Sequence, residues 1–416
     1  MATWTTARPG RPRQAESEGA LRVALYSPDS YGLGHFRRNR RIATTLVKTM
    51  PEASVLMLTG CLAADRFSAL PNTDLVRLPA TTKTASGSYR ARSLGIDRDS
   101  LLRLRGAILE AALAAFEPDL FIVDHAPAGL AGELRPVLER LRDSGSPTIV
   151  ALGLRDIIDA GPAVRRTWLA DDTYSLLEWA YDEIWVYGRQ EVFDPVREYG
   201  MTPTAASRMR FLGYIGDIGP VRPRSRRRIP LVVAMGGGGE DAHPLLRAAL
   251  EARSISERRF RLIVFPGPLM TFEQKRDLEV RAAELGKDVL VHHFTERAPA
   301  IVADADCVVT MGGYNSMLET IGAGVPSVVV PRVSPRAEQL LRAERMSARG
   351  WTTLLHPDDL TPEALLGCIL ELCNKGVPMR MPSDHLSGLA NLADRSLYLL
   401  EQSRAEESVA GEWPTV

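Results

Sequence analysis

A short strand that leads into a glycine turn and a helix is the feature that most constrains the fold of this 416-residue chain. Residues 307–310, mostly β-branched, come shortly before Gly312 and Gly313, and a helical pattern begins at Tyr314. The first N–H groups of such a helix lack backbone partners, and together with the helix dipole they favour an anionic phosphate. The segment therefore predicts a phosphate-binding turn at the end of a buried strand.

Both halves of the chain begin with the same combination of strand, glycine loop and helix. Residues 21–26 precede a first glycine loop, and residues 230–234 precede the four glycines at 236–239. Strands then alternate with helices, which is typical of parallel sheets, and the length favours two domains. The predicted fold class is α/β, with two Rossmann-like, doubly wound parallel-sheet domains and a ligand cleft between them.

The expected domain boundaries lie where the sequence becomes rich in polar residues, Gly, Pro and Arg. We expect a disordered arm at 1–20, an N-terminal domain at 21–213, a linker at 214–229, a C-terminal domain at 230–385, a helix at 386–404 that could pack back on the N-terminal domain, and a tail at 405–416. The polar segment 80–99 is expected to be a long loop of the kind that often forms a lid.

Composition excludes several classes of protein. Lys plus Arg and Asp plus Glu both number 51, so no net field attracts nucleic acid. No stretch reaches the roughly 18 apolar residues of a membrane span. The four cysteines lack metal-binding spacing and are expected to be reduced. We therefore expect a cytoplasmic protein without a metal ion or cofactor, and a peripheral membrane contact remains open.

Candidate acceptor-side residues follow the ends of strands in the first half. His35 lies at the first glycine turn, where it could act as a general base, because the pKa of histidine is normally near neutrality. Capping a helix or binding backbone is its alternative role. Asp124 and His125 follow one strand, and Arg155 and Asp156 follow another. These residues could orient or deprotonate an acceptor, with Asp124 as the second candidate base, or they could form a salt-bridged rim.

Candidate donor-side residues lie in the second half. Gly237 and Gly238 can offer a ligand only backbone N–H groups, and a tight turn is the alternative reading. Glu319 lies among apolar helix residues, so its carboxylate needs hydrogen-bonding partners, which a diol such as ribose would supply. Glu338 and Gln339 begin a later helix, where a capping or surface role competes with ligand binding.

Four motifs, GLGH, HHFTERAP, SMLETIGAGVP and PRAEQ, resemble those of GT-B glycosyltransferases close to glycosyltransferase family 28, including a bacterial branch of predicted glycosyltransferases. The motif GLGH matches the family's glycine-rich loop and includes Gly34 and the histidine position His35. The resemblance implies that the uracil base, diphosphate, ribose and donor sugar are bound by Phe294, Thr295, Gly312, Gly313, Asn315, Glu319, Glu338 and Gln339. The family's serine before the donor helix is absent, and one of its paired glutamines is a glutamate here.

The resemblance also implies a function. We expect the transfer of a sugar from a nucleotide donor, such as UDP-GlcNAc, to an acceptor hydroxyl, without a metal ion and with inversion. The acceptor is open between a glycan, a lipid-linked sugar and a small natural product. A UDP-sugar hydrolase or 2-epimerase on the same fold, or a non-catalytic protein that binds nucleotide sugars, is the alternative.

Overall fold

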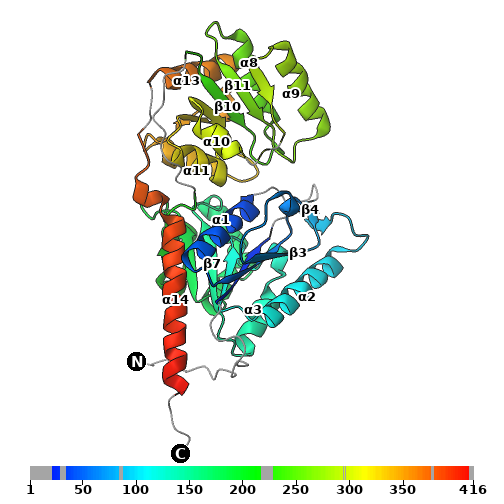
Figure 1. The fold of residues 1–416 in the computed structure, drawn as a ribbon, viewed down its shortest axis with the longest axis vertical. Coiled ribbons are helices and arrows are strands. Elements are labelled where there is room, and N and C mark those ends of the chain that lie inside the picture. Colours follow the sequence, from blue (N-terminus) through cyan, green and yellow to red (C-terminus); the bar gives the residue numbers. More distant parts are fainter. Residues whose placement is uncertain are drawn as a thin grey trace, which may run out of the picture.

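A computed structural model describes residues 21–28, 34–83, 88–216, 228–293, 295, 297–375 and 379–411. The chain forms two α/β domains, one above the other in Figure 1, with the C-terminal domain at the top. The predicted arm at 1–20 and most of the predicted linker lie outside the described residues.

The N-terminal domain contains a seven-stranded parallel sheet in the order β3-β2-β1-β6-β7-β8-β9. Its strands are β1 (Arg22–Ser27), β2 (Ser54–Thr59), β3 (Thr73–Arg77), β6 (Leu120–Asp124), β7 (Ile149–Arg155), β8 (Glu183–Tyr187) and β9 (Met209–Phe211). Its helices are α1 (Gly34–Thr49), α2 (Arg98–Phe116), α3 (Arg135–Asp143), α4 (Gly161–Ala170), α5 (Thr173–Trp179), α6 (Pro195–Tyr199) and α7 (Pro203–Ser207), with 3-10 turns η1 (Ala64–Arg66) and η2 (Leu130–Gly132).

The segment 80–99 differs from its prediction as a single loop. Strands β4 (Thr81–Lys83) and β5 (Tyr89–Ala91) form an antiparallel pair within it, and α2 already begins at Arg98. The side chain of Asp97 caps α2 by accepting from the backbone N–H of Ser100. Whether the segment acts as a lid stays a prediction.

The C-terminal domain contains a six-stranded parallel sheet in the order β12-β11-β10-β13-β14-β15. Its strands are β10 (Leu231–Met235), β11 (Arg261–Phe265), β12 (Val289–Val291), β13 (Cys307–Thr310), β14 (Ser327–Val329) and β15 (Thr353–Leu354). Its helices are α8 (His243–Ile255), α9 (Phe272–Glu284), α10 (Ala298–Ala303), α11 (Tyr314–Gly322), α12 (Glu338–Ser347) and α13 (Pro362–Lys375), with the 3-10 turn η3 (Pro357–Asp359).

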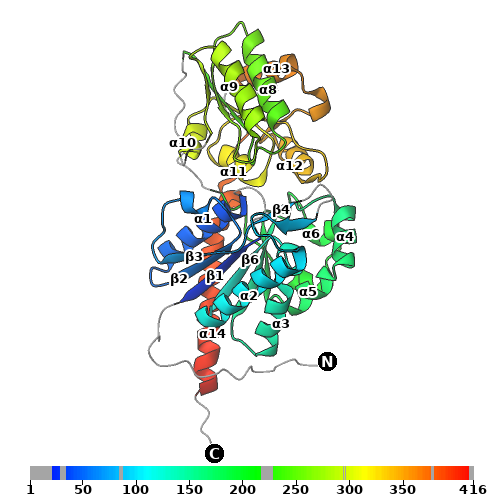
Figure 2. The ribbon, with the colours of Figure 1, turned by 90° about the vertical axis from the view of Figure 1, so that its right-hand side faces the viewer.

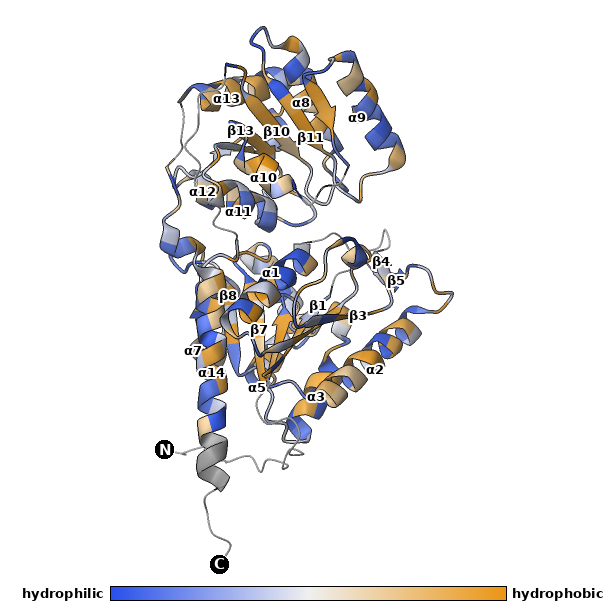
Figure 3. Ribbon diagram, viewed as in Figure 1, coloured by the Kyte–Doolittle hydropathy of each residue, from blue (hydrophilic) through white to orange (hydrophobic). Residues whose placement is uncertain are grey.

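Both sheets change direction of strand order at their first strand, β1 or β10. The next two strands along the chain extend the sheet on one side of it, and the later strands extend the sheet on the other side. Ligands of open α/β sheets bind outside the carboxyl ends of the strands at this point. The strand interiors are apolar, and the polar residues gather on outer helix faces such as that of α9 (Figure 3). The predicted class of two doubly wound parallel-sheet domains is confirmed.

Helix α14 (Gly388–Gly411) follows the 3-10 turn η4 (Ser383–Leu386) and runs along the N-terminal domain (Figure 1). Leu392 and Leu400 are buried in the same cluster as Leu46 of α1. The helix also continues beyond the predicted start of the tail at residue 405, because Ala and Glu after that position favour a helix. Helix α14 therefore follows the C-terminal domain in sequence but packs on the N-terminal domain.

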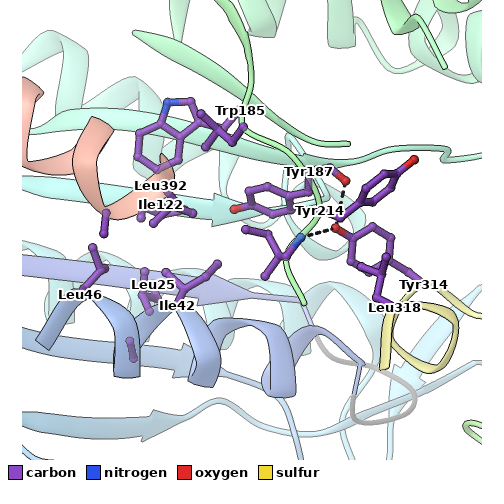
Figure 4. Packing of buried hydrophobic residues seen from close by; sticks show 14 of the residues in the cluster. Leu25, Ile42, Leu46, Ile122, Trp185, Tyr187, Tyr214, Tyr314, Leu318 and Leu392 are labelled. Carbon is purple, nitrogen blue, oxygen red and sulfur yellow. Dashed lines mark hydrogen bonds between the residues drawn. The ribbon is translucent and has the colours of Figure 1, made fainter. Parts of the chain in front are cut away.

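Helix α11 extends the core across the domain boundary. Tyr314 and Leu318 lie in one buried cluster with Tyr187 and Tyr214 (Figure 4). The hydroxyl of Tyr314 donates to the carbonyl of Tyr187 at 2.9 Å and accepts from the backbone N–H of Ile215 at 2.9 Å. The helix with the predicted phosphate-binding turn is therefore packed directly against the N-terminal domain.

Candidate functional site

The N-terminal sheet edge carries a histidine that is held by a buried carboxylate. Nδ1 of His35 lies 2.6 Å from Oδ2 of Asp124, whose side chain has no exposed surface. Arg38 donates to both oxygens of the same carboxylate, at 2.8 and 2.6 Å. When Nδ1 of His35 donates to Asp124, Nε2 is left as the nitrogen that can accept a proton.

Asp124 is ionised and inaccessible. Burial would raise its pKa, but the charges of Arg38 and His35 and their hydrogen bonds lower the pKa to about 2. Since both oxygens are occupied and no part of the side chain is exposed, Asp124 cannot reach an acceptor hydroxyl. The expectation of Asp124 as a second candidate base is therefore replaced by a positioning role behind His35.

His125 and Arg155 form a second pair at this edge. His125 has a φ of +68°, which is uncommon outside glycine, and such backbone strain is often found at functional sites. Its ring centroid lies 5.4 Å from that of His35, and its Nε2 lies 2.7 Å from Nη2 of Arg155. Burial and the charges of Arg155, His35 and Arg38 lower the pKa of His125 well below its usual value. His125 is therefore neutral and can accept from Arg155.

Asp156, which directly follows β7, pairs with an arginine of the C-terminal domain. Its carboxylate accepts from Nη2 of Arg342 at 2.8 Å, and both side chains are almost fully buried. Arg342, which belongs to α12, also donates to the carbonyls of Gly312 and Ile157. Asp156 thus joins the two domains, and its acceptor-side role stays a prediction.

At the C-terminal sheet edge, the glycine loop 236–239 presents backbone groups rather than side chains. Gly237 and Gly238 are exposed, and their N–H groups form no hydrogen bond within the described residues. Neighbouring Gly239 has φ +92°, and a Cβ there would lie 2.4 Å from the carbonyl oxygen of Pro266. A Cβ added to Gly237 would be 3.8 Å from Oγ of Ser316, so this loop lies beside the first turn of α11. The two predicted phosphate-binding segments are therefore adjacent.

The start of α11 also lies against the start of α1. Gly312 has φ +78°, and Gly313 is the N-cap of α11 without a side-chain cap. Asn315 donates through Nδ2 to the carbonyl oxygen of Gly34 at 2.9 Å, and its Oδ1 is buried without a partner among the described residues. Neither helix has an acidic residue in its first turn. The two positive helix ends therefore meet beside His35.

Glu319 is engaged by the opposite domain. Its Oε1 accepts from Arg37 at 2.5 Å and from Arg41 at 2.6 Å, and its side chain is only 6% exposed. The arginines occupy one oxygen, Oε1, of the carboxylate that the resemblance assigns to ribose. Ribose binding by Glu319 stays a prediction, and the ligand would compete with these two side chains for the carboxylate.

The remaining donor-side candidates form hydrogen bonds with residues close to them in the sequence. Oε1 of Glu338 accepts from Arg332 at 2.7 Å, while its Oε2 is buried without a partner among the described residues. Gln339 accepts from the backbone N–H of Arg332. Thr295 accepts from the backbone N–H of Arg297 just before α10, and Phe294 lies outside the described residues.

Sequence reasoning missed the arginines that cross or support the site. Arg37, Arg38, Arg41 and Arg342 are indistinguishable from solvated helix residues without the fold. One signal was present: the run FRRNRRIA directly after GLGH places several cations in the first turns of a helix, where the dipole disfavours them. Such an unfavourable placement indicates that anionic partners lie nearby.

Within the described residues, no group of three or more His, Cys, Asp or Glu side chains is arranged to hold a metal ion. Those residues also include no helix with the length and apolarity to cross a membrane.

Sequence comparison gives a family match over the second half. Residues 232–395 match the glycosyltransferase family 28 C-terminal domain. A UDP-N-acetylglucosamine--N-acetylmuramyl-(pentapeptide) pyrophosphoryl-undecaprenol N-acetylglucosamine transferase of Clostridium kluyveri is 30% identical over 100 residues, which is 24% of this chain and 28% of the relative. Transferase 3 of the same description from Bacillus thuringiensis is 24% identical over 43% of this chain and 46% of the relative. The chain thus spans less than half the length of these curated relatives.

Solved structures match over nearly the whole chain. The calicheamicin glycosyltransferase CalG4 has a TM-score of 0.54 and 18% identity, covering 94% of this chain and 97% of its own. The MurG of Acinetobacter baumannii has a TM-score of 0.54 and 14% identity, covering 92% and 99%. At these identities the likeness concerns the fold, and it confirms the expected GT-B architecture.

Proposed function

We propose that this protein transfers a sugar from a nucleotide donor to an acceptor hydroxyl, since residues 232–395 match the glycosyltransferase family 28 C-terminal domain. The observation that carries the proposal is the meeting of a carboxylate-held histidine, His35, with the open start of α11 across the domain boundary. One domain then supplies the base and the other the anion-binding turn.

In the proposed reaction, Nε2 of His35 takes the proton of the acceptor hydroxyl. The acceptor oxygen forms a bond to the anomeric carbon while the bond from that carbon to the diphosphate oxygen breaks. The diphosphate leaves with the electron pair. Attack by the acceptor opposite to the leaving group inverts the anomeric configuration. Asp124 stabilises the charged imidazole that forms, since its carboxylate stays ionised.

The leaving diphosphate binds at the start of α11. Its charge is stabilised by the helix dipole and by N–H groups that the backbone leaves unpaired near Gly313 and at Gly237 and Gly238. These groups act in the place that a metal ion takes in other transferases. The curated relatives' names favour UDP-GlcNAc as the first donor to test and a lipid-linked sugar as the first acceptor class.

One contact between the domains involves the predicted ribose ligand. Oε1 of Glu319 is held by Arg37 and Arg41, which belong to the other domain, so ribose would compete with a contact that joins the domains. We therefore propose that the ligand-free arrangement is closed by this contact and opens for the donor.

The test measures the release of nucleoside diphosphate from UDP-GlcNAc, UDP-glucose and UDP-galactose, with and without a lipid extract or a panel of small hydroxylated acceptors. Acceptor-dependent release from one donor, with a glycosylated product, supports the transferase. Release that is independent of every acceptor would identify a hydrolase instead. Tight binding of a nucleotide sugar without turnover across the panel would contradict catalysis.

A further inference from the structure

Arg38 is a buried cation that contacts both members of the His35–Asp124 pair. Its side chain is only 1% exposed, and its Nε and Nη2 donate to the two oxygens of Asp124. Its Nη2 also lies 3.0 Å from Nδ1 of His35. Burial alone would lower the pKa of Arg38, but the charge and hydrogen bonds of Asp124 raise that pKa above its usual value. The positive charge behind His35 is therefore permanent.

Aromatic rings from both domains contact the guanidinium of Arg38. Its Cζ lies 5.8 Å from the ring centroid of Tyr187, at the end of β8, and 5.5 Å from that of Tyr314, the first residue of α11 (Figure 4). A cation within about 6 Å of an aromatic centroid is attracted to the ring, and more strongly when it is desolvated. The aromatic contacts of Arg38 are therefore complete only while α11 is docked on the N-terminal domain.

Tyr314 also joins this cation to the predicted phosphate-binding turn. It directly follows Gly313, the N-cap of α11, and the guanidinium of Arg342 lies 5.7 Å from its ring centroid. Arg342 in turn donates to the carbonyl of Gly312. The same aromatic ring thus contacts the arginine behind the histidine and the arginine behind the turn.

The charges around His35 indicate what Arg38 contributes. A buried carboxylate needs a positive partner, so Asp124 alone would hold a second proton on the ring of His35. With Arg38 in place the carboxylate is already neutralised, and the charge of Arg38 repels a protonated ring. The neighbouring ring of His125 is neutral and is bonded to Arg155, which adds further positive charge. The ring of His35 can then be neutral when an acceptor hydroxyl arrives, as a general base requires.

Arg38 also bears on which nitrogen of His35 carries the proton. Arginine can only donate, so Nδ1 of His35 either accepts from Arg38 or donates to Asp124. Nδ1 lies 2.6 Å from Oδ2 of Asp124 and 3.0 Å from Nη2 of Arg38, and the shorter contact favours donation to the carboxylate. Because Arg38 binds both oxygens of Asp124, the carboxylate stays aligned with Nδ1, and Nε2 stays free to accept.

We infer that Arg38 is a positioning residue for His35: its charge balances Asp124, so that the ring is neutral with Nε2 free, and Tyr314 of the C-terminal domain completes its contacts. The inference rests on the proposed function, in which His35 is the base. It adds that the base is fully formed only when α11 is docked. A donor bound to an open arrangement then meets a weaker base, which limits hydrolysis of the donor by water.

The test observes the histidine rings directly and needs no ligand. Protein labelled with nitrogen-15 in its histidines is titrated by NMR from about pH 5 to about pH 9, a range that brackets the usual titration of histidine. The signals of His35 are those missing from His35→Ala. In wild type the neutral ring should carry its proton on Nδ1.

The variants change the charge or the aromatic contact. In Arg38→Met the ring of His35 should stay protonated to a pH about one unit higher than in wild type. Arg38→Lys keeps the charge and should restore most of the wild-type titration. Tyr314→Leu should shift the titration in the same direction as Arg38→Met, and Tyr314→Phe, which keeps the aromatic ring, should not.

Turnover with UDP-GlcNAc and a lipid extract is the second measurement. Arg38→Met should reduce kcat about 10-fold near neutral pH and leave UDP binding within a few-fold of wild type. In a His35→Ala background the same change should reduce the residual turnover no further, because Arg38 acts through His35. Arg40→Met is the matched control, since Arg40 lies on the same helix and its guanidinium is 5.5 Å from the ring centroid of Phe67.

The two measurements separate the possible failures. The inference is overturned if the neutral ring of His35 carries its proton on Nε2 in wild type, if Arg38→Met leaves the titration of His35 unchanged, or if the loss of turnover persists in the His35→Ala background. If the rings titrate as expected but wild type cleaves no nucleotide sugar with any acceptor, the proposed function fails instead. Thermal unfolding of all variants separates these results from misfolding, and Tyr314→Leu tests the inference if Arg38→Met does not fold.

Discussion

The two sheet edges that face each other across the domain boundary have the same topology, but they present different chemical groups. The N-terminal edge presents charged and titratable side chains, with His35, Asp124 and Arg155 at its centre. The C-terminal edge presents glycine backbone at 236–239 and at the start of α11. Side chains can move protons, whereas a glycine backbone can only bind. Under the proposed function, proton transfer would therefore belong to the N-terminal edge and donor binding to the C-terminal edge.

The largest effect should come from His35→Ala. If proton transfer belongs to the N-terminal edge, turnover falls about 100-fold or more, because a positioned base contributes about that much. Binding of UDP to the C-terminal edge should stay within a few-fold of wild type. Steady-state turnover and calorimetry measure the two quantities, and His356→Ala, at an exposed ion pair with Asp358, is the control. Normal turnover would refute the division.

The next effect concerns pH and Asp124. Its pKa in the fold is about 2, below the ordinary 3.8, so the ionised carboxylate stabilises the fold above about pH 4 and loses that contribution as the pH falls towards 2. The loss amounts to roughly 2 kcal/mol. Denaturant unfolding between pH 6 and pH 2 should show this component in wild type and not in Asp124→Asn. Asp65→Asn, at an exposed ion pair, should keep it.

A smaller effect is expected from Glu319→Ala on the donor side. Loss of the ribose contact should raise the donor KM about 10-fold, the size of one or two charge-assisted hydrogen bonds. Arg37→Ala combined with Arg41→Ala should leave the KM unchanged or lower it, because these arginines compete with ribose for the carboxylate. An equal rise of the KM in both variants would show instead that the arginines bind the nucleotide.

The smallest effect concerns the joint between the two domains that the hydroxyl of Tyr314 forms with the backbone of Tyr187 and Ile215. Tyr314→Phe leaves the backbone groups of Tyr187 and Ile215 without their buried partner, which should reduce the free energy of unfolding by about 1 kcal/mol. Tyr398→Phe, at an exposed hydroxyl, is the matched control. If unfolding becomes two separate transitions in Tyr314→Phe, the joint contributes more to domain cooperativity than its hydrogen bonds suggest.

Sequence patterns predicted much of the scaffold. The alternation of strands and helices and the paired glycine loops determined two parallel-sheet domains, because periodicity and turn chemistry depend on neighbouring residues. The same local reasoning placed Asp124 at the end of a strand, and placed His35 at the start of the helix that follows the first strand, as the structure has them. It could not distinguish Asp124 as a buried support from Asp124 as a base, since that depends on Arg38, which lies 86 residues away in the chain.

By itself, the sequence determined the two strand–glycine–helix units and the residue types at their ends, since each follows from local propensity and spacing. Only the tertiary structure decided which residues share a partner: Glu319 with Arg37 and Arg41, Asp156 with Arg342, and His125 with Arg155. These pairings join distant segments, and two of them join separate domains. Their free energies depend on distance and burial after folding, which no local pattern records.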